Sequence, residues 1–131
     1  METIRVPTRA REELVEITAE VTRIVTESGV EEGFCVLWSA HTTAGLTVNE
    51  SADPDVARDI SAWLREGIPP DPSFRHTEGN ADSHIKTSLV GPGLTLLVSG
   101  GRPVLGTWQG VFLCEFDGPR TRQVHVRVAA G

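Results

Sequence analysis

Apolar side chains recur at helical spacing along residues 9–28, where every third or fourth position is apolar. Thr8 can cap the start of such a helix, and Gly29 suits its end because glycine readily adopts the left-handed conformation that closes many helices. The pattern therefore predicts one long helix that covers a sheet, with an apolar face made of Leu14, Ile17, Val21, Ile24 and Val25.

Two further helices are predicted in the middle of the chain. The first covers residues 53–66, because Asp53 is a favourable cap and a proline follows it at the first helical position. The second covers residues 80–89, and its core-facing side chains are predicted to be Ala81, Ile85 and Leu89. Residues 67–79, which are rich in proline and glycine, are interpreted as a long loop of the kind that often carries function.

Shorter patterns predict strands. Residues 33–40 form a continuous apolar run, which is typical of a strand buried on both faces. Leu46 and Val48 alternate with polar neighbours and predict a short strand. The last third predicts antiparallel strands over 94–98, over 108–116, which has two distinct faces, and over 122–128, which alternates cleanly. Together these elements predict one domain over residues 1–131, of the α+β class, in which two main helices pack against a mostly antiparallel β-sandwich.

The charge balance restricts the partners. Eighteen acidic and twelve basic residues give a net charge of −6, which argues against a nucleic-acid partner held by phosphate contacts. No apolar run is long enough to cross a membrane, and we recognise no leader peptide. Cys35 and Cys114 lie in apolar runs without a CxxC motif, so we interpret them as reduced core thiols and expect a cytoplasmic protein.

Three of the four histidines stand in polar clusters. His41 follows an apolar strand and precedes Thr42 and Thr43, while His76 and His84 lie on either side of the third helix start. Histidine is the commonest metal ligand and a proton carrier near neutral pH. His41, His76 and His84 are therefore candidate ligands of zinc or another divalent ion, although their spacing matches no zinc motif. For His41, a hydrogen-bonded structural histidine beside a hydroxyl-rich turn is the alternative.

Two carboxylates are candidate catalytic groups. Glu50 precedes the helix cap and can orient a histidine or take a proton, unless it is a solvated loop acid. Glu115 lies among apolar neighbours, and a buried carboxylate needs a partner, for which Arg120 and Arg122 are the candidates. A structural ion pair and a catalytic acid both fit Glu115. His125 alternates with valines and is predicted to lie on the surface.

The start of the third helix is a candidate anion site. Asn80 can begin this helix, whose first N–H groups are free to bind an anion, and Lys86 adds a positive charge. The alternative is an ordinary helix cap with a surface lysine.

Five short segments occur in an order that resembles the YjbQ family, also known as the secondary thiamine-phosphate synthase family. The resemblance covers nearly the whole chain and rests on the segments His41–Leu46, Asn49–Glu50, Gly79–Lys86, Gly106–Gln109 and Glu115–Arg120. It implies a compact α+β fold around a β-sandwich, a homotrimer, and sites near subunit boundaries. It also implies an ability to join a pyrimidine diphosphate to a thiazole phosphate with release of diphosphate. The matched positions are His41, Glu50, Asn80, His84, Gln109, Glu115 and Arg120, whereas His76 falls in a loop of variable length.

The resulting hypothesis is a small trimeric enzyme with a histidine-rich polar pocket. His41 and His84 would bind a divalent metal, zinc or magnesium, or act as acid and base, and Glu50 or Glu115 would orient them. A phosphorylated small molecule would be held by Thr42, Thr43, Asn80, Lys86, Gln109 and Arg120. Two alternatives stay open: a metal-dependent hydrolase, and a module that binds a phosphorylated metabolite without turning it over.

Overall fold

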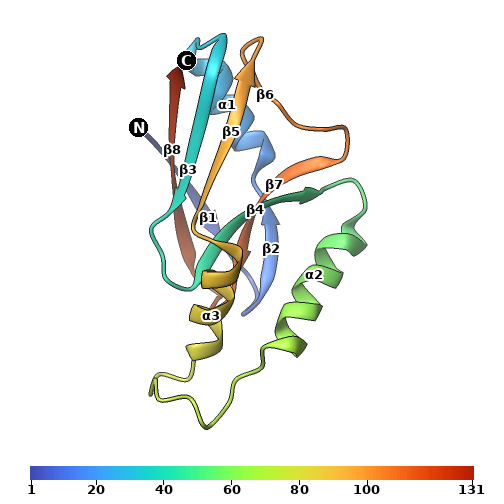
Figure 1. Cartoon of the computed structure of the whole chain (residues 1–131), viewed down its shortest axis with the longest axis vertical. Helices are drawn as coiled ribbons and strands as arrows, with labels where there is room; N and C mark the ends of the chain where they lie inside the picture. The colour runs from blue at the N-terminus through green and yellow to red at the C-terminus, as the bar shows by residue number, and fades with distance from the viewer.

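The computed structural model describes residues 1–131 and contains eight strands and three helices (Figure 1). In chain order these are β1 (Glu2–Pro7), β2 (Glu13–Glu16), α1 (Thr18–Ser28), β3 (Glu32–Ser39), β4 (Ala44–Glu50), α2 (Pro54–Gly67), α3 (Ala81–Val90), β5 (Gly93–Ser99), β6 (Arg102–Pro103), β7 (Gln109–Glu115) and β8 (Thr121–Ala130).

The strands form two sheets in which every pairing is antiparallel. The larger sheet has the order β1-β8-β3-β5-β6, and the smaller has the order β2-β7-β4. Apolar side chains of both sheets and of α1 share one buried cluster, which includes Val21, Leu37, Leu113 and Val124. The predicted α+β class and antiparallel pairing are confirmed.

The long first helix was predicted wrongly. Its second half is α1, but residues 13–16 form β2, which pairs with β7 from Glu13↔Glu115 to Glu16↔Phe112. Thr8 does not cap a helix, because its hydroxyl donates to the Glu115 carboxylate at 2.7 Å. Four residues of strand fit a helical spacing as well as a strand pattern, so long-range pairing decided the outcome.

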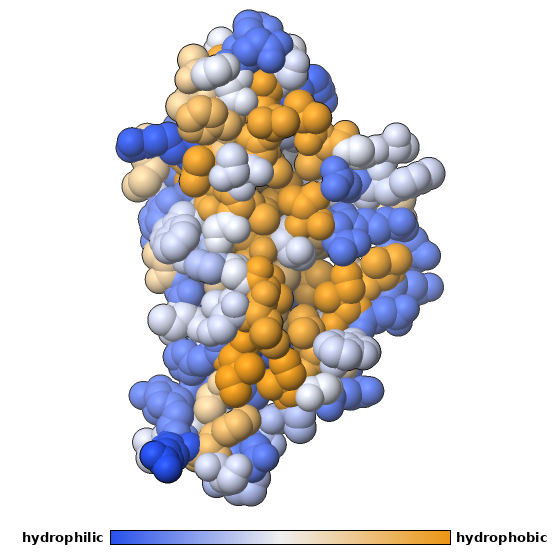
Figure 2. All heavy atoms as spheres, viewed as in Figure 1, coloured by the Kyte–Doolittle hydropathy of each residue, from blue (hydrophilic) through white to orange (hydrophobic).

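Strand β3 is not buried on both faces. Cys35, Leu37 and Ser39 point into the core, whereas Phe34, Val36 and Trp38 are 38–51% exposed on the outer face of the larger sheet. Figure 2 shows apolar residues gathered in a band on the face where β3, β5 and α3 lie in Figure 1. This outer face is therefore an apolar surface that no helix of the chain covers.

Helix α3 has its apolar and polar faces reversed relative to the prediction. Ile85 is 38% exposed and Leu89 is 68% exposed. The side chains that face inward are polar instead: Asp82, Ser83, Lys86 and Thr87. None of the three helices is both long and apolar enough to span a lipid bilayer.

Candidate functional site

Three loops that carry predicted site residues meet above a buried ion pair. The carboxylate of Glu115, at the end of β7, accepts hydrogen bonds from Arg122 Nε at 2.9 Å to Oε1 and 3.1 Å to Oε2. Arg122 Nη2 also donates to Thr43 Oγ1 at 2.8 Å and to the Thr43 carbonyl oxygen at 3.3 Å. Glu115 is fully buried and Arg122 is 1% exposed. The pair therefore ties the β3–β4 loop to β7 and β8.

Burial alone would raise the pKa of Glu115. Hydrogen bonds from Arg122, from the Thr8 hydroxyl and from the Asp117 backbone N–H outweigh this effect, so the pKa of Glu115 lies below its ordinary value. Glu115 therefore stays ionised and has no free oxygen for a proton transfer. Of the two interpretations left open, this geometry favours the structural ion pair.

The turn after β7 is fixed by the same network. Asp117 Oδ2 accepts from Asn80 Nδ2 at 2.7 Å and from Arg120 Nη2 at 3.1 Å. The Arg120 backbone N–H donates to Thr8 Oγ1 at 3.0 Å. A side chain on Gly118 would meet Thr8 Oγ1 at 2.8 Å, so only glycine allows this close approach. Asn80 and Arg120 are thereby held together, with the Arg120 side chain about half exposed.

A second ion cluster lies beneath the start of α3. Lys86 Nζ is 2.8 Å from Asp82 Oδ2 and 2.7 Å from Glu12 Oε1, and Lys86 is fully buried. Arg11 binds Asp82 through both terminal nitrogens, at 3.1 and 3.2 Å. The charge of Lys86 is therefore already matched inside the chain. We call Glu12, Asp82, Lys86, Glu115 and Arg122, with Arg11 at the rim, the ionic end of the molecule.

His41 lies at the edge of the larger sheet. Its Nε2 accepts a hydrogen bond from the Gln123 backbone N–H at 2.9 Å. Partial burial lowers the pKa of His41, and the positive charges of Arg122 and Arg120 lower it further, against an opposing effect of Glu115. Thr42 beside it is exposed, whereas Thr43 is buried under Arg122. His41 is thus a hydrogen-bonded histidine that still reaches the surface.

The three predicted metal ligands do not converge within one chain. His76 and His84 are close, with ring centroids 5.1 Å apart in an edge-to-face arrangement. His76 Nε2 is also 3.8 Å from Glu78 Oε2. No three side chains of His, Cys, Asp or Glu lie where they could share one metal ion. A metal site made of His41, His76 and His84 is therefore not assembled within this chain.

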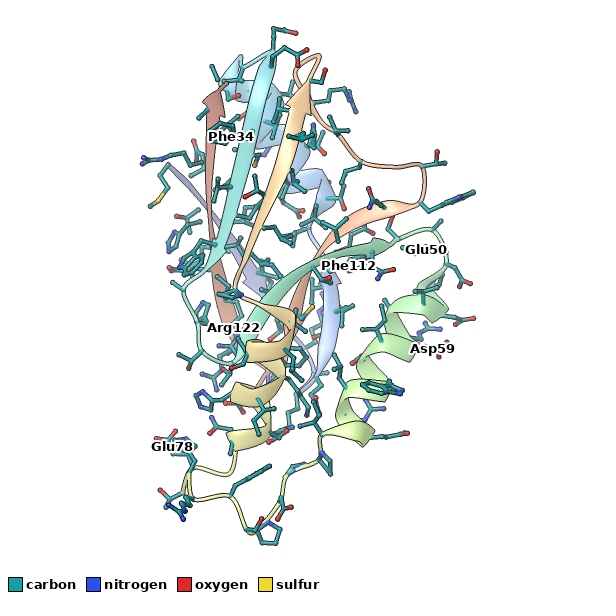
Figure 3. The ribbon with its side chains drawn as sticks, in the orientation of Figure 1. Phe34, Glu50, Asp59, Glu78, Phe112 and Arg122 are labelled. Carbon is teal, nitrogen blue, oxygen red and sulfur yellow. The ribbon has the colours of Figure 1, made fainter.

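Glu50 and Gln109 lie away from the other predicted residues. They pair with each other at one end of the β4–β7 ladder, whereas Glu115 pairs with Ala44 at the other end. The two ends are six residue steps apart along the strand, which is roughly 20 Å. Figure 3 shows Glu50 and Arg122 on different sides of the molecule.

Glu50 lines a cleft between α2 and the smaller sheet, which shares only Glu12 with the ionic end. The cleft has a volume of about 650 Å³ and is strongly acidic, and its lining includes Glu12, Glu13, Glu16, Glu50, Asp53 and Asp59. Glu50 Oε2 accepts from the Asp53 backbone N–H at 3.2 Å, and Gln109 Oε1 accepts from the Gly106 N–H at 2.8 Å. Neither residue contacts a histidine in the chain.

Sequence reasoning missed Thr8, Arg11, Glu12 and Asp82, which are all central to the ionic end. Arg11 and Glu12 carried no signal, because their partners lie about seventy residues away in the chain. Asp82, by contrast, stands four residues before Lys86, and that spacing is the usual signal for a helical ion pair. His125 is half-buried and close enough to His41 to affect its pKa.

Comparison with known sequences identifies the family. The model of the family described as "UPF0047 protein YjbQ-like" matches residues 2–131. The UPF0047 protein MJ1081 of Methanocaldococcus jannaschii is 49% identical over 124 residues, which covers 95% of this chain and 90% of the relative. The UPF0047 protein YugU of Bacillus subtilis is 43% identical over 129 residues, covering 98% of both chains.

Solved structures agree with the sequence matches. A crystal structure of an uncharacterized YjbQ/UPF0047 protein from Clostridium acetobutylicum superposes with a TM-score of 0.95 at 43% identity, over 98% of this chain and 100% of that one. A YbjQ-like protein of unknown function from Sulfolobus solfataricus gives a TM-score of 0.94 at 35% identity, over 99% of this chain and 96% of that one. The chain therefore belongs to the YjbQ/UPF0047 family.

Proposed function

We propose that this protein is a small enzyme, active as a homotrimer, that binds a phosphorylated small molecule at the surface above the ionic end. The observation that carries the proposal is that the polar side chains around Arg122 form two groups, one buried and one accessible. Buried hydrogen bonds that Arg122 donates and Glu115 accepts hold three loops rigidly, while His41, His84 and Arg120 keep surface that a ligand can reach. Rigid support beneath accessible polar groups is the arrangement that ligand sites require.

The local charge favours an anionic ligand. The chain as a whole carries −6, yet the pKa of His41 is lowered by burial and, beyond that, by the positive charges of Arg122 and Arg120, against an opposing effect of Glu115. Arg120 has a partly exposed guanidinium group whose single carboxylate partner, Asp117, it shares with Asn80. A guanidinium group is well suited to hold a phosphate oxygen through parallel hydrogen bonds.

The reaction that the family resemblance implies is a condensation. A carbon–nitrogen bond forms between the pyrimidine and the thiazole as the carbon–oxygen bond to diphosphate breaks, and diphosphate leaves with the bonding electrons. Arg120 and the N–H groups at the start of α3 would bind the diphosphate, and His84 would donate a proton or a hydrogen bond to it. Zinc or magnesium would neutralise part of the diphosphate charge, with His76 and His84 as the closest histidine pair.

The homotrimer is supported by the uncovered apolar surface. Phe34, Trp38 and Leu97 are 40–67% exposed on the larger sheet, and Leu89 is 68% exposed on α3. A further apolar groove of about 550 Å³ lies between α2 and α3, lined mainly by Ile60, Trp63, Leu64, Leu89 and Val90. Exposed apolar patches of this kind commonly mark protein–protein interfaces.

Assembly of several subunits would also bring the separated site residues into one pocket. Glu50 and Gln109 lie at the opposite end of the β4–β7 ladder from Glu115, so one chain cannot bring them to His41. In a ring of identical subunits, the acidic cleft of one subunit can face the His41 side of the next. The complete pocket would then lie at the subunit boundary, as the family resemblance implies.

The experiment is a direct assay on the purified protein. Wild type, His84→Ala and Arg120→Ala would be incubated with the pyrimidine diphosphate and the thiazole phosphate, with and without magnesium, and thiamine phosphate and diphosphate would be measured. We expect product from wild type and at least a tenfold loss in each variant, since each removes a hydrogen bond to a charged group. Equal product from wild type and both variants would place the chemistry elsewhere. Sedimentation of a monomer would refute the trimer.

One observation favours the binding module as the second candidate. The carboxylates at the ionic end, Glu12, Asp82 and Glu115, are all paired with arginine or lysine. No free carboxylate is therefore available there as a general base. Thermal stabilisation by diphosphate with no product formed would select this candidate, and release of phosphate from a phosphate ester would select the hydrolase.

A further inference from the structure

The hydrogen bond of His41 follows from where β3 ends. The ladder between β3 and β8 stops at the pair Ser39↔Val124. The next residue of β8, Gln123, is thus left with an N–H group that β3 no longer serves. His41 Nε2 takes the place of the missing strand carbonyl and accepts from this N–H at 2.9 Å.

The loop that carries His41 is fixed on both sides. The Ser39 backbone N–H donates to the Pro92 carbonyl oxygen at 2.7 Å, and the Ser39 hydroxyl donates to the Ala44 carbonyl oxygen at 2.8 Å. The His41 backbone N–H points to the same hydroxyl oxygen at 3.4 Å. The imidazole is therefore positioned by the loop beneath it, and its bond to Gln123 belongs to the folded sheet.

This bond determines which ring nitrogen carries the proton. A neutral imidazole has one N–H group and one lone pair in the ring plane. Because the lone pair of Nε2 accepts from Gln123, the hydrogen of the neutral ring must be on Nδ1. We infer that His41 serves the proposed ligand site as a neutral Nδ1–H hydrogen-bond donor to an anionic oxygen. In this role it is neither a general base nor a metal ligand. The part of this inference that concerns the ligand rests on the proposed function. The position of the proton rests only on the hydrogen bond from Gln123.

The charges around the ring agree with this role. Burial disfavours the imidazolium form, and the positive charges of Arg122 on β8 and Arg120 in the preceding turn disfavour it further, as does the neighbouring His125. Glu115 is the opposing carboxylate, and it is occupied by Arg122 and Thr8. A second proton on the ring would sit on Nε2, opposite the Gln123 N–H, and would break the sheet hydrogen bond.

The first test is nitrogen NMR of the free protein with ¹⁵N-labelled histidine, in which His41 is assigned from its loss in a His41 variant. We expect the Nδ1–H tautomer at pH 7, because Nε2 accepts the hydrogen bond from Gln123. A spectrum with Nε2–H, or an averaged mixture of the two tautomers, would overturn the inference. So would a shift of the His41 nitrogens on addition of one equivalent of zinc.

Two substitutions separate the sheet bond from the donor. In His41→Gln the side-chain carbonyl can still accept from Gln123, but the donor at the Nδ1 position is lost. In His41→Asn the amide nitrogen can replace the Nδ1–H donor, while the longer reach to Gln123 is lost. Inorganic phosphate and diphosphate would be titrated into each by calorimetry, with thermal unfolding measured in parallel.

We expect His41→Gln to fold like wild type and to bind diphosphate about tenfold more weakly or worse, the usual effect of losing a hydrogen bond to a charged group. His41→Asn should unfold at a lower temperature but lose less affinity. Equal affinity of wild type and His41→Gln would overturn the donor role. If wild type binds neither anion, the proposed function fails and the donor role fails with it, while the nitrogen spectrum still decides the tautomer.

Discussion

Helices α1 and α3 are nearly equal in length, with 11 and 10 residues, and both pack against the sheets, but they bury opposite kinds of side chain. Helix α1 buries Val21, Ile24 and Val25. Helix α3 buries Asp82, Ser83, Lys86 and Thr87 and leaves Leu89 exposed. The first arrangement is the usual route to stability through removal of apolar surface from water. The second arrangement buries charged side chains, which contribute little net stability even when they are paired.

The difference fits our proposal that α3 mainly positions side chains at the ionic end, whereas α1 mainly stabilises the fold. Buried ion pairs fix one geometry because a shift leaves a charge without its partner. Asn80 and His84 are therefore oriented accurately at the ionic end. The apolar side chains that α3 leaves outward belong, in our proposal, to the contact with another subunit. Each of the following changes tests this contrast.

The largest effect is expected from Arg122→Met. It leaves the Glu115 carboxylate buried without its main partner, and breaking a buried pair in this way costs about 3–5 kcal/mol in free energy of unfolding. Urea denaturation measures the loss. The double variant Glu115→Leu with Arg122→Met should recover most of it, because no buried charge remains. Ile24→Ala on α1, at about 2–5 kcal/mol, is the apolar counterpart. A double variant no more stable than Arg122→Met would contradict this account.

Lys86→Met should cost less, about 2 kcal/mol, because Arg11 continues to pair with both Asp82 and Glu12. The matched control on the same helix is Thr87→Val. Thr87 is buried and its hydroxyl oxygen has no hydrogen-bond partner, so removal of that hydroxyl should be neutral or slightly stabilising. Chemical denaturation of the two variants side by side would decide whether α3 is held by its charges. A larger loss from Thr87→Val would show that it is not.

Acid should loosen the ionic end before the apolar core. Burial raises the pKa of Asp82, but its bonds to Arg11 and Lys86 outweigh this, and the pKa values of Asp82 and Glu115 both lie below their ordinary values of 3.8 and 4.5. Such depressed groups contribute stability that is fully present above the ordinary values and is lost as the pH falls through the lowered ones. Amide hydrogen exchange at pH 5 and pH 3 should show α3 losing protection more than α1. Equal loss in both helices would argue against the contrast.

The smallest effect on the fold is expected from Leu89→Ser. Leu89 is 68% exposed, and an exposed substitution usually changes the free energy of unfolding by less than about 0.5 kcal/mol. Its effect should appear in assembly instead, as weaker association in sedimentation equilibrium. Ser88→Ala, on the neighbouring exposed position, is the control and should leave association unchanged. Unaltered association in Leu89→Ser would remove this part of α3 from the interface.

The elements that the sequence predicted well are those whose local pattern agrees with their final environment. Helix α2 was predicted from its Asp53 cap, whose side chain does accept from the Asp55 N–H at 2.9 Å. Strand β8 followed from alternation, and its first residues do alternate between exposed and buried, whereas β5 and β7 were located correctly although residues 110–115 of β7 are all buried. The failure at β2 has a physical cause, because its pairing with β7 is a contact across about a hundred residues that no local pattern carries.

The site was predicted in part. The need of Glu115 for an arginine partner was recognised from its apolar neighbours, and Arg122 fills that role. Lys86 was predicted to add positive charge to an anion site, with a surface lysine as the alternative, but it is buried and paired with Glu12, a residue far away in sequence. The orientation of α3 was misjudged for the same reason, since an apolar stripe was taken to face the core. Where a helix turns charges inward, the partners that make this possible lie on other elements.

The exposed indoles have a practical consequence for spectroscopy. All three tryptophans, Trp38, Trp63 and Trp108, are 51–71% exposed, and the chain has no tyrosine. In the folded chain before assembly, the ultraviolet emission therefore comes from rings that already contact water, and unfolding changes their surroundings little. Covering the apolar surface around Trp38 and Trp63 would shift the emission to shorter wavelength. In this protein intrinsic fluorescence is thus a reporter of what docks on the surface rather than of whether the core is formed.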